Sequence, residues 1–188
     1  NIDFIEFSSG GEMIFTGSNH DGTVKIWDVL TGDDIHNLIG HTGTFYSAEF
    51  SPDGKMMVTS SMDGSAKLWD VVSGKLIFNF KERNTFAYFP SFSPDGRMLV
   101  TLVENGLVKL WNLSTGQLTD VVSATNPNGV FSAEFSPDGN RIITSSYDGS
   151  FIIYNVESRE QISYFIFDSD PKKWMHLHPS GLFDASPE

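Results

Sequence analysis

Residues 50–70, FSPDGKMMVTSSMDGSAKLWD, decide the fold of this chain, because closely similar stretches occur in phase on both sides of them. FSSGGEMIFTGSNHDGTVKIWD begins at Phe7, FSPDGRMLVTLVENGLVKLWN at Phe92 and FSPDGNRIITSSYDGSFIIYN at Phe135. The period is 42, 42 and 43 residues, measured between the aromatic residues that close the stretches, Trp27, Trp69, Trp111 and Tyr154. A fixed period of this length predicts one supersecondary unit that is repeated and that packs on its neighbours.

Turn residues separate short apolar strands within each copy. Ser51-Pro52-Asp53-Gly54 fits a type I turn, because Pro presets φ at the second position and Gly suits the fourth. Asp63-Gly64 fits a hairpin turn in which Gly takes the positive φ. The strands expected in this copy are one that ends at Phe50 and those at residues 56–60, 66–69 and 76–80. Four antiparallel strands in every copy predict an all-β fold built from propeller blades.

Two motifs recur along the chain. One is Trp-Asp or Trp-Asn, at Trp27-Asp28, Trp69-Asp70 and Trp111-Asn112, and the other is Phe-Ser-Pro-Asp-Gly. A Gly-His dipeptide occurs once, at Gly40-His41. In these motifs the chain resembles the WD-repeat β-propeller family. The resemblance covers residues 2–167 and implies four blades, at 2–39, 44–80, 86–122 and 129–167. Residues 168–188 are interpreted as the start of a fifth repeat, because His178-Pro179-Ser180-Gly181 matches the Ser-Pro-Asp-Gly turn in register.

Four and a half repeats leave the closure of the ring unexplained. A propeller removes its exposed sheet edges by closing radially, and the resemblance implies seven blades as the commonest number. The missing blades belong to a longer polypeptide, or two copies complete one ring, or a partner covers the open end. The sequence favours the first explanation, a fragment of a larger propeller, because the chain opens without Met inside an expected strand at residues 2–7.

Composition narrows the classes of partner. The 188 residues include 12 Lys and Arg against 24 Asp and Glu, which gives a net charge of −12. This charge argues against nucleic acid and against anionic membrane surfaces, because both are bound largely through Lys and Arg. The sequence has no apolar run long enough to span a membrane. It has no cysteine, which excludes disulfides and thiol chemistry.

The family resemblance implies a buried hydrogen-bonded set of His, Ser or Thr, Asp and Trp in each complete blade. The second repeat supplies all four members, His41, Thr59, Asp63 and Trp69. The other repeats supply incomplete sets, with Tyr154 as a substitute donor: Thr16, Asp21 and Trp27; Thr101, Asn105 and Trp111; Thr144, Asp148 and Tyr154. The set recurs with the repeat, and the sequence has no Gly-x-Ser-x-Gly elbow, so we interpret it as structural rather than as a catalytic triad. No catalytic residue and no cofactor are predicted.

Two histidines have a spacing that suggests a metal site. His176 and His178 are two residues apart, so on a strand both would point to the same face. A third ligand is not evident, although Asp168, Asp170 and Asp184 are near in sequence. The favoured interpretation is a strand that enters a turn, and no metal is predicted.

Aromatic residues recur at positions that the family resemblance places on the top face, near the central channel. Four residues before the Phe that ends each first strand lie Tyr46, Tyr88 and Phe131. Directly before the turn Asp or Asn lie His20, Met62, Glu104 and Tyr147. Exposed aromatic residues and Met are enriched at protein-binding surfaces, so these seven residues form a predicted binding surface. The alternative is that strands favour aromatic residues and that some of them belong to the core.

The function predicted from these features is a non-catalytic scaffold for protein–protein interaction, with a protein or peptide partner on the top face. The alternative is a sensor or regulatory propeller domain of a larger multi-domain enzyme, such as a caspase-like peptidase. This alternative rests on residues 174–187, which resemble segments of large bacterial WD-repeat proteins, some of which carry such a peptidase domain elsewhere.

Overall fold

Short β-strands make up all the regular secondary structure in the described part of this computed structural model, which covers residues 2–20, 22–81, 87–103, 107–123, 130–167, 174–177, 180 and 183–185. The first sheet contains β1 (Phe4–Phe7), β2 (Met13–Gly17), β3 (Val24–Asp28) and β4 (Asp34–Asn37). The second contains β5 (Phe45–Phe50), β6 (Met56–Ser61), β7 (Ser65–Asp70) and β8 (Leu76–Lys81). The third contains β9 (Ala87–Phe92), β10 (Met98–Val103), β11 (Leu107–Asn112) and β12 (Gln117–Ser123). The fourth begins with β13 (Val130–Phe135), β14 (Arg141–Ser146), β15 (Ser150–Asn155) and β16 (Gln161–Phe167).

The turn chemistry read from the sequence explains why each sheet is an antiparallel meander. In the second sheet the Gly54 N–H donates to the Ser51 carbonyl at 2.8 Å, and Gly54 has a φ of +69°. The Ser51 hydroxyl donates to Asp53 Oδ1 at 2.7 Å, and this hydrogen bond between two residues of the turn stabilises it. The predicted turn is therefore confirmed at this position, and the same backbone bond recurs at Ser93–Gly96 and Ser136–Gly139.

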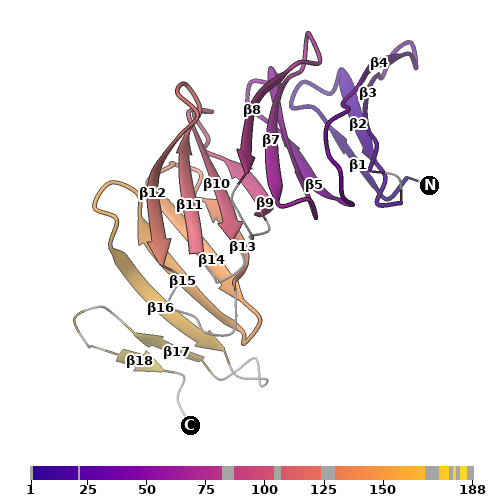
Figure 1. Ribbon diagram of the computed structural model, residues 1–188. Helices are drawn as coiled ribbons and strands as arrows, with labels where there is room; N and C mark the ends of the chain where they lie inside the picture. Colours follow the sequence, from indigo (N-terminus) through magenta and orange to yellow (C-terminus); the bar gives the residue numbers. More distant parts are fainter. Residues whose placement is uncertain are drawn as a thin grey trace.

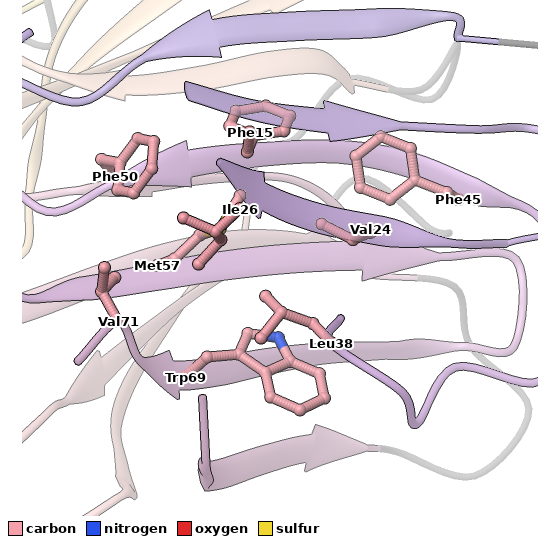
Figure 2. Close-up of a cluster of buried hydrophobic side chains, with 9 residues drawn as sticks. All are labelled: Phe15, Val24, Ile26, Leu38, Phe45, Phe50, Met57, Trp69 and Val71. Carbon is pink, nitrogen blue, oxygen red and sulfur yellow. The ribbon is translucent and has the colours of Figure 1, made fainter. Parts of the chain in front are cut away.

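The four sheets pack face to face in sequence order (Figure 1). Figure 2 shows the junction of the first two sheets, where Phe15, Val24, Ile26 and Leu38 of the first repeat meet Phe45, Phe50, Met57, Trp69 and Val71 of the second. Two further buried clusters join the second sheet to the third and the third to the fourth. The first strands of neighbouring sheets also contact one another, β5 with β9 and β9 with β13. This arrangement matches the predicted all-β fold of four-stranded blades.

The hairpin expected to open a fifth repeat is paired with the fourth sheet instead. β17 (Trp174–Leu177) pairs antiparallel with β16, and β18 (Phe183–Ala185) pairs with β17, so this sheet has six strands. An edge strand such as β16 exposes a row of N–H and C=O groups, and pairing with β17 satisfies them. The assignment of residues 168–188 to a fifth repeat stays a prediction.

The array of sheets is open: the first sheet lies at one end and the sheet of β13–β18 at the other (Figure 1). The described residues therefore form an open array of blades, which is compatible with the predicted fragment of a larger propeller. Among the residues that the structure describes, none forms a helix with the length and apolar character that crossing a membrane requires.

Candidate functional site

Bulges in the first strands decide where the predicted aromatic residues lie. The β5–β6 register shifts between Phe45 and Ser47, and the β13–β14 register shifts between Val130 and Ser132. Tyr46 and Phe131 are therefore the extra residues of two equivalent bulges. Because a bulge bends the strand locally and re-aims a side chain, both residues leave the alternation that would otherwise set their direction.

The third sheet places its bulge one residue later. Tyr88 pairs with Leu102 and Ser91 with Val100, so Phe89 and Pro90 together face a single residue of β10. Phe89 has a φ of +41°, which is rare for a residue with a side chain. Pro90 has no N–H to donate to the neighbouring strand, so its presence in the sequence indicated that the strand pairing would be irregular at this point. Counting along the sequence selects Tyr88, whose side chain lies outside the described part of the chain, and misses Phe89.

Four aromatic rings form a continuous row across three sheets. The ring centroids of Tyr46 and Phe89 are 6.0 Å apart, those of Phe89 and Phe131 5.6 Å, and those of Phe131 and Tyr147 5.3 Å. These separations are typical of attractive aromatic pairs. Phe131 and Tyr147 are exposed, whereas Tyr46 and Phe89 are half-buried. We call these four residues the aromatic row.

The remaining members of the predicted surface have different positions. Met62 is exposed in the turn between β6 and β7, the equivalent of Tyr147 in the fourth sheet. His20 is also exposed, and its backbone N–H is held by Ser18 Oγ at 3.2 Å. Glu104 lies outside the described residues. The structure thus brings three of the seven predicted residues together, Tyr46, Phe131 and Tyr147, and adds Phe89.

A cavity of about 350 Å³ lies where the first strands of all four sheets come together. Its lining residues come from β1, β5, β9 and β13, and they are Glu6, Ser47, Ala48, Glu49, Phe89, Pro90, Ser91, Ser132, Ala133 and Glu134. Phe89 belongs both to this lining and to the aromatic row, so the row borders the cavity. The glutamates occupy one repeat position, directly before Phe7, Phe50 and Phe135.

Glu49 has an unusual environment for a carboxyl group. Burial raises its pKa to about 7, and the nearby charges of Glu6 and Glu134 act in the same direction. Hydrogen bonds from the Phe92 N–H, at 3.4 Å, and from Ser91 oppose this shift but do not cancel it. The repeated Glu before Phe was visible in the sequence, but the closeness of these carboxyl groups depends on how the sheets pack.

We expect Glu49→Gln to stabilise the protein at alkaline pH by about 2 kcal/mol. The pKa of Glu49 is about 7 in the folded state against 4.5 for an unperturbed group, so the folded state holds the extra proton. Folding is therefore penalised as pH rises from about 4.5 through 7, and the amide removes that penalty. Urea unfolding of the variant and the wild type at pH 5 and pH 8 measures the difference. An equal difference at both pH values would contradict the prediction.

The polar set of the second repeat forms one connected hydrogen-bond network. His41 Nδ1 lies 3.1 Å from Asp63 Oδ2, and His41 Nε2 lies 2.8 Å from Thr59 Oγ1. The Trp69 indole N–H donates to Thr59 Oγ1 at 2.8 Å. A proton on Nδ1 satisfies every member: Nδ1–H donates to the carboxylate, and Nε2 accepts from the hydroxyl. The imidazole is therefore neutral and links a turn to the centre of the sheet.

The environment of this network fixes its protonation. Burial lowers the pKa of His41 below its usual value, and the hydrogen bond and charge of Asp63 only partly offset this effect. For Asp63, burial alone would raise the pKa, but hydrogen bonds from Ser65, Thr42 and His41 outweigh it and lower the pKa to about 2. At neutral pH the pair is thus an ionised carboxylate and a neutral imidazole. Both side chains are almost fully buried, which suits a structural element.

The other repeats keep only parts of this network. Trp27 donates to Thr16 Oγ1, and Trp111 to Thr101 Oγ1, both at 2.8 Å. Asp148 Oδ1 accepts from the N–H and the hydroxyl of Ser150, at 3.0 and 2.6 Å. Asp21 and Asn105 lie outside the described residues.

The fourth repeat departs from the predicted pattern at its aromatic residue. Tyr154 is buried, yet Thr144 Oγ1 has no hydrogen-bond partner among the described residues. The expectation that Tyr154 replaces Trp as the donor to Thr144 is therefore wrong. A phenol carries its O–H at the far end of the ring, whereas an indole carries its N–H on the side nearer the backbone.

His176, the first of the two histidines with a metal-ligand spacing, contacts a hydroxyl group and an aromatic ring. His176 Nε2 lies 3.1 Å from Ser163 Oγ, and the His176 ring stacks on Phe165 at 4.2 Å between centroids. His178 lies outside the described residues. Within the described ranges, no three His, Asp or Glu side chains are grouped as metal ligands would be.

Comparisons with known proteins agree with the repeat architecture. The family model "WD domain, G-beta repeat" matches residues 1–28, 32–70, 84–112 and 116–155. WD repeat and SOCS box-containing protein 1 is 40% identical over 63 residues in Takifugu rubripes and 38% identical over 63 residues in Homo sapiens. Apoptotic protease-activating factor 1 of Danio rerio is 39% identical over 54 residues.

These matches with single proteins are short relative to both chains. They cover 32%, 32% and 29% of this chain, and 14%, 15% and 4% of the respective relatives. The similarity to these relatives is therefore limited to about one and a half repeats. The family model, in contrast, matches most of the chain.

Proposed function

The chain belongs to the WD-repeat family, whose repeats generally serve protein interaction, and from this premise we propose that it is a non-catalytic scaffold that binds a protein or peptide through the aromatic row. Met62 and Tyr147 extend this surface at equivalent turns of the second and fourth sheets. Nothing in the proposal requires a cofactor.

The observation that carries this proposal is the continuity of the aromatic row from Tyr46 to Tyr147. Bulges hold three of the four rings on rigid strands, so a partner pays little conformational entropy when it docks on them. The end formed by Phe131 and Tyr147 is exposed to solvent. Large aromatic side chains that are rigid and accessible are the residues that most often dominate protein-binding energies.

The charge of the chain supports a protein partner over a polyanion. A chain with 24 acidic and 12 basic residues repels the phosphates of nucleic acids and the head groups of anionic lipids. The row itself consists of uncharged side chains and borders a cavity that contains three glutamates. A polyanion would therefore be a poor ligand at this place.

A random-peptide display library selected on the chain tests this proposal. Selected peptides are synthesised, and their Kd is measured by fluorescence polarisation for the wild type and for Phe131→Ala and Tyr147→Ala. We expect each substitution to weaken binding by about tenfold, because truncation of a central aromatic residue commonly costs more than 1 kcal/mol. The melting temperature of each variant should stay near that of the wild type, because both side chains are exposed.

Val72→Ala is the matched control. Val72 is an exposed apolar residue that follows β7, so it lies at the opposite end of the sheet from Met62. Binding to this variant should match the wild type. Peptides that bind both row variants with undiminished affinity would refute the proposal, and so would row variants that unfold at clearly lower temperature.

The alternative function, regulation of a caspase-like peptidase within a larger enzyme, has no support in the comparisons. It stays a prediction that depends on sequence outside these 188 residues.

A further inference from the structure

The cavity beside the aromatic row carries a glutamate at the same position of three repeats. Glu6 of β1, Glu49 of β5 and Glu134 of β13 each lie directly before the Phe that ends the first strand, and all three line the cavity. β9 has Ser91 at this position, and the Ser91 hydroxyl donates a hydrogen bond to Glu49. The acidic position therefore belongs to the repeat and does not depend on where the array of sheets ends. We call this space the acidic cavity.

The pleat of the first strands places the carboxyl groups on the side of the cavity. Ser47 and Glu49 are two residues apart in β5, beyond its bulge, so their side chains leave the same face of the sheet. Ser132 and Glu134 repeat this arrangement in β13. All four residues line the cavity, and so does Phe89 of the aromatic row. A partner that docks on the row therefore lies next to a space whose walls carry hydroxyl and carboxyl groups.

The negative charge of the acidic cavity has no counter-charge in the described structure. None of the described lining residues is Lys, Arg or His. The ion pairs found within the described ranges use other carboxylates, those of Asp34, Asp53, Asp63 and Asp95. Burial raises the pKa of Glu49, and repulsion from Glu6 and Glu134 adds to this effect. A positive charge placed in the cavity would relieve that repulsion and favour the ionised carboxyl groups.

The geometry of the cavity fits a cationic side chain better than a metal ion. Within the described ranges, no three His, Asp or Glu side chains are grouped as metal ligands would be, so the carboxyl groups surround a space rather than a point. At about 350 Å³ the cavity lies at the lower end of the range of ligand pockets, which suits a single side chain. Lys and Arg combine an aliphatic stem, which can pack on an aromatic ring, with a charged head that donates several hydrogen bonds.

We propose that the partner is a peptide segment that places a Lys or Arg side chain in the acidic cavity while its neighbouring residues pack on the aromatic row. The aliphatic stem lies against Phe89, whose ring face also attracts the positive charge. The charged head reaches Glu49 and the nearby carboxyl groups of Glu6 and Glu134. Charge complementarity thus identifies the partner as a basic peptide, and this inference rests on the proposed function.

Peptide libraries selected in parallel on the wild type and on the double variant Glu49→Gln, Glu134→Gln test this proposal. We expect the peptides selected on the wild type to share one Lys or Arg, and those selected on the double variant to lack it. Glutamine keeps the shape of glutamate without its charge. Because Glu49→Gln is expected to stabilise the fold at alkaline pH, unfolding does not account for such a difference.

The double variant Glu12→Gln, Glu157→Gln is the matched control, because it makes the same change in net charge. Both glutamates are exposed, one directly before β2 and the other in the turn after β15, and neither lines the cavity. This control should select the same basic peptides as the wild type. A control that loses the basic residue as the cavity variant does would show that the selection reflects only the net charge of −12, and the proposal would be wrong.

The Kd of one selected peptide should depend on the charge of both partners and on pH. Replacing its Lys or Arg by norleucine, which keeps an aliphatic stem, should weaken binding to the wild type by about tenfold, and Glu49→Gln should do the same. The groups that face Glu49 are Glu6, Glu134, the Ser91 hydroxyl and the Phe92 N–H, and its pKa is about 7. Because the cation favours ionised Glu49, binding should tighten between pH 6 and pH 8 in the wild type and change little in Glu49→Gln.

Failure of this inference is distinguishable from failure of the proposed function. Peptides that need Phe131 and Tyr147 but share no basic residue would overturn the inference and leave the proposed function intact. Peptides that bind Glu49→Gln as tightly as the wild type would have the same consequence. Peptides that bind the Phe131→Ala and Tyr147→Ala variants with undiminished affinity would refute the proposed function, and this inference with it.

Discussion

Asp63→Ala is expected to lower the free energy of unfolding by about 3 kcal/mol. The substitution removes the acceptor for His41 Nδ1–H and for the Thr42 N–H, and it leaves an almost fully buried imidazole without its partner. It also removes the hydrogen bonds that Ser65 makes to the turn. Urea unfolding, followed by tryptophan fluorescence at one fixed protein concentration, measures the loss.

Asp148→Ala is the matched control for this experiment, because Asp148 occupies the same turn in the fourth repeat. It accepts the same two hydrogen bonds from Ser150, but that repeat has no His at the position of His41. The control should cost less than Asp63→Ala, because the fourth repeat has no imidazole at this position to lose its partner. Equal losses for the two substitutions would show that the imidazole contributes nothing to the stability of the second sheet.

The same substitution at two equivalent threonines should have opposite effects. Thr59→Val is expected to destabilise the protein by about 2 kcal/mol, because the indole N–H of Trp69 and the Nε2 of His41 both lose their partner inside the sheet. Thr144→Val should be neutral or stabilising by about 1 kcal/mol, because the hydroxyl that it removes is buried without a hydrogen-bond partner in the described structure. Valine has nearly the shape of threonine, so packing changes little at either site.

Thermal and urea unfolding of both valine variants give the comparison directly. Because the two positions share the same place in the repeat, differences in strand propensity cancel between them. A loss at Thr144 as large as that at Thr59 would mean that the Thr144 hydroxyl has a strong partner in solution. That outcome would contradict the hydrogen-bond pattern found for the fourth repeat.

The strands and turns of this protein were predictable because their signals are local. A Ser-Pro-Asp-Gly turn or an Asp-Gly hairpin needs only its own residues, and the repeat supplies each signal several times. The residues of the polar network were also predicted, because the family resemblance implies which repeat positions supply them. What the sequence could not show is whether donor and acceptor meet, and this is where Tyr154 and Thr144 differ from the pattern.

Features that depend on register or on neighbouring sheets were missed. Phe89 joins the aromatic row because the third sheet shifts its bulge by one residue, and counting back from Phe92 cannot reveal such a shift. The high pKa of Glu49 requires β1, β5, β9 and β13 to surround one cavity. β17 pairs with β16 because the N–H and C=O groups of an edge strand need partners, and this edge exists only once the fourth sheet has formed.

Each sheet is a meander in which every strand pairs with the strand next to it in the sequence. Hydrogen-bonded contacts therefore join residues that are close along the chain, and such contacts form quickly because only short loops must be closed. During synthesis the residues of one complete sheet leave the ribosome before the residues of the next sheet do. Each finished sheet then offers its apolar side as a template for its successor, so the molecule can assemble from the amino terminus in steps of one repeat.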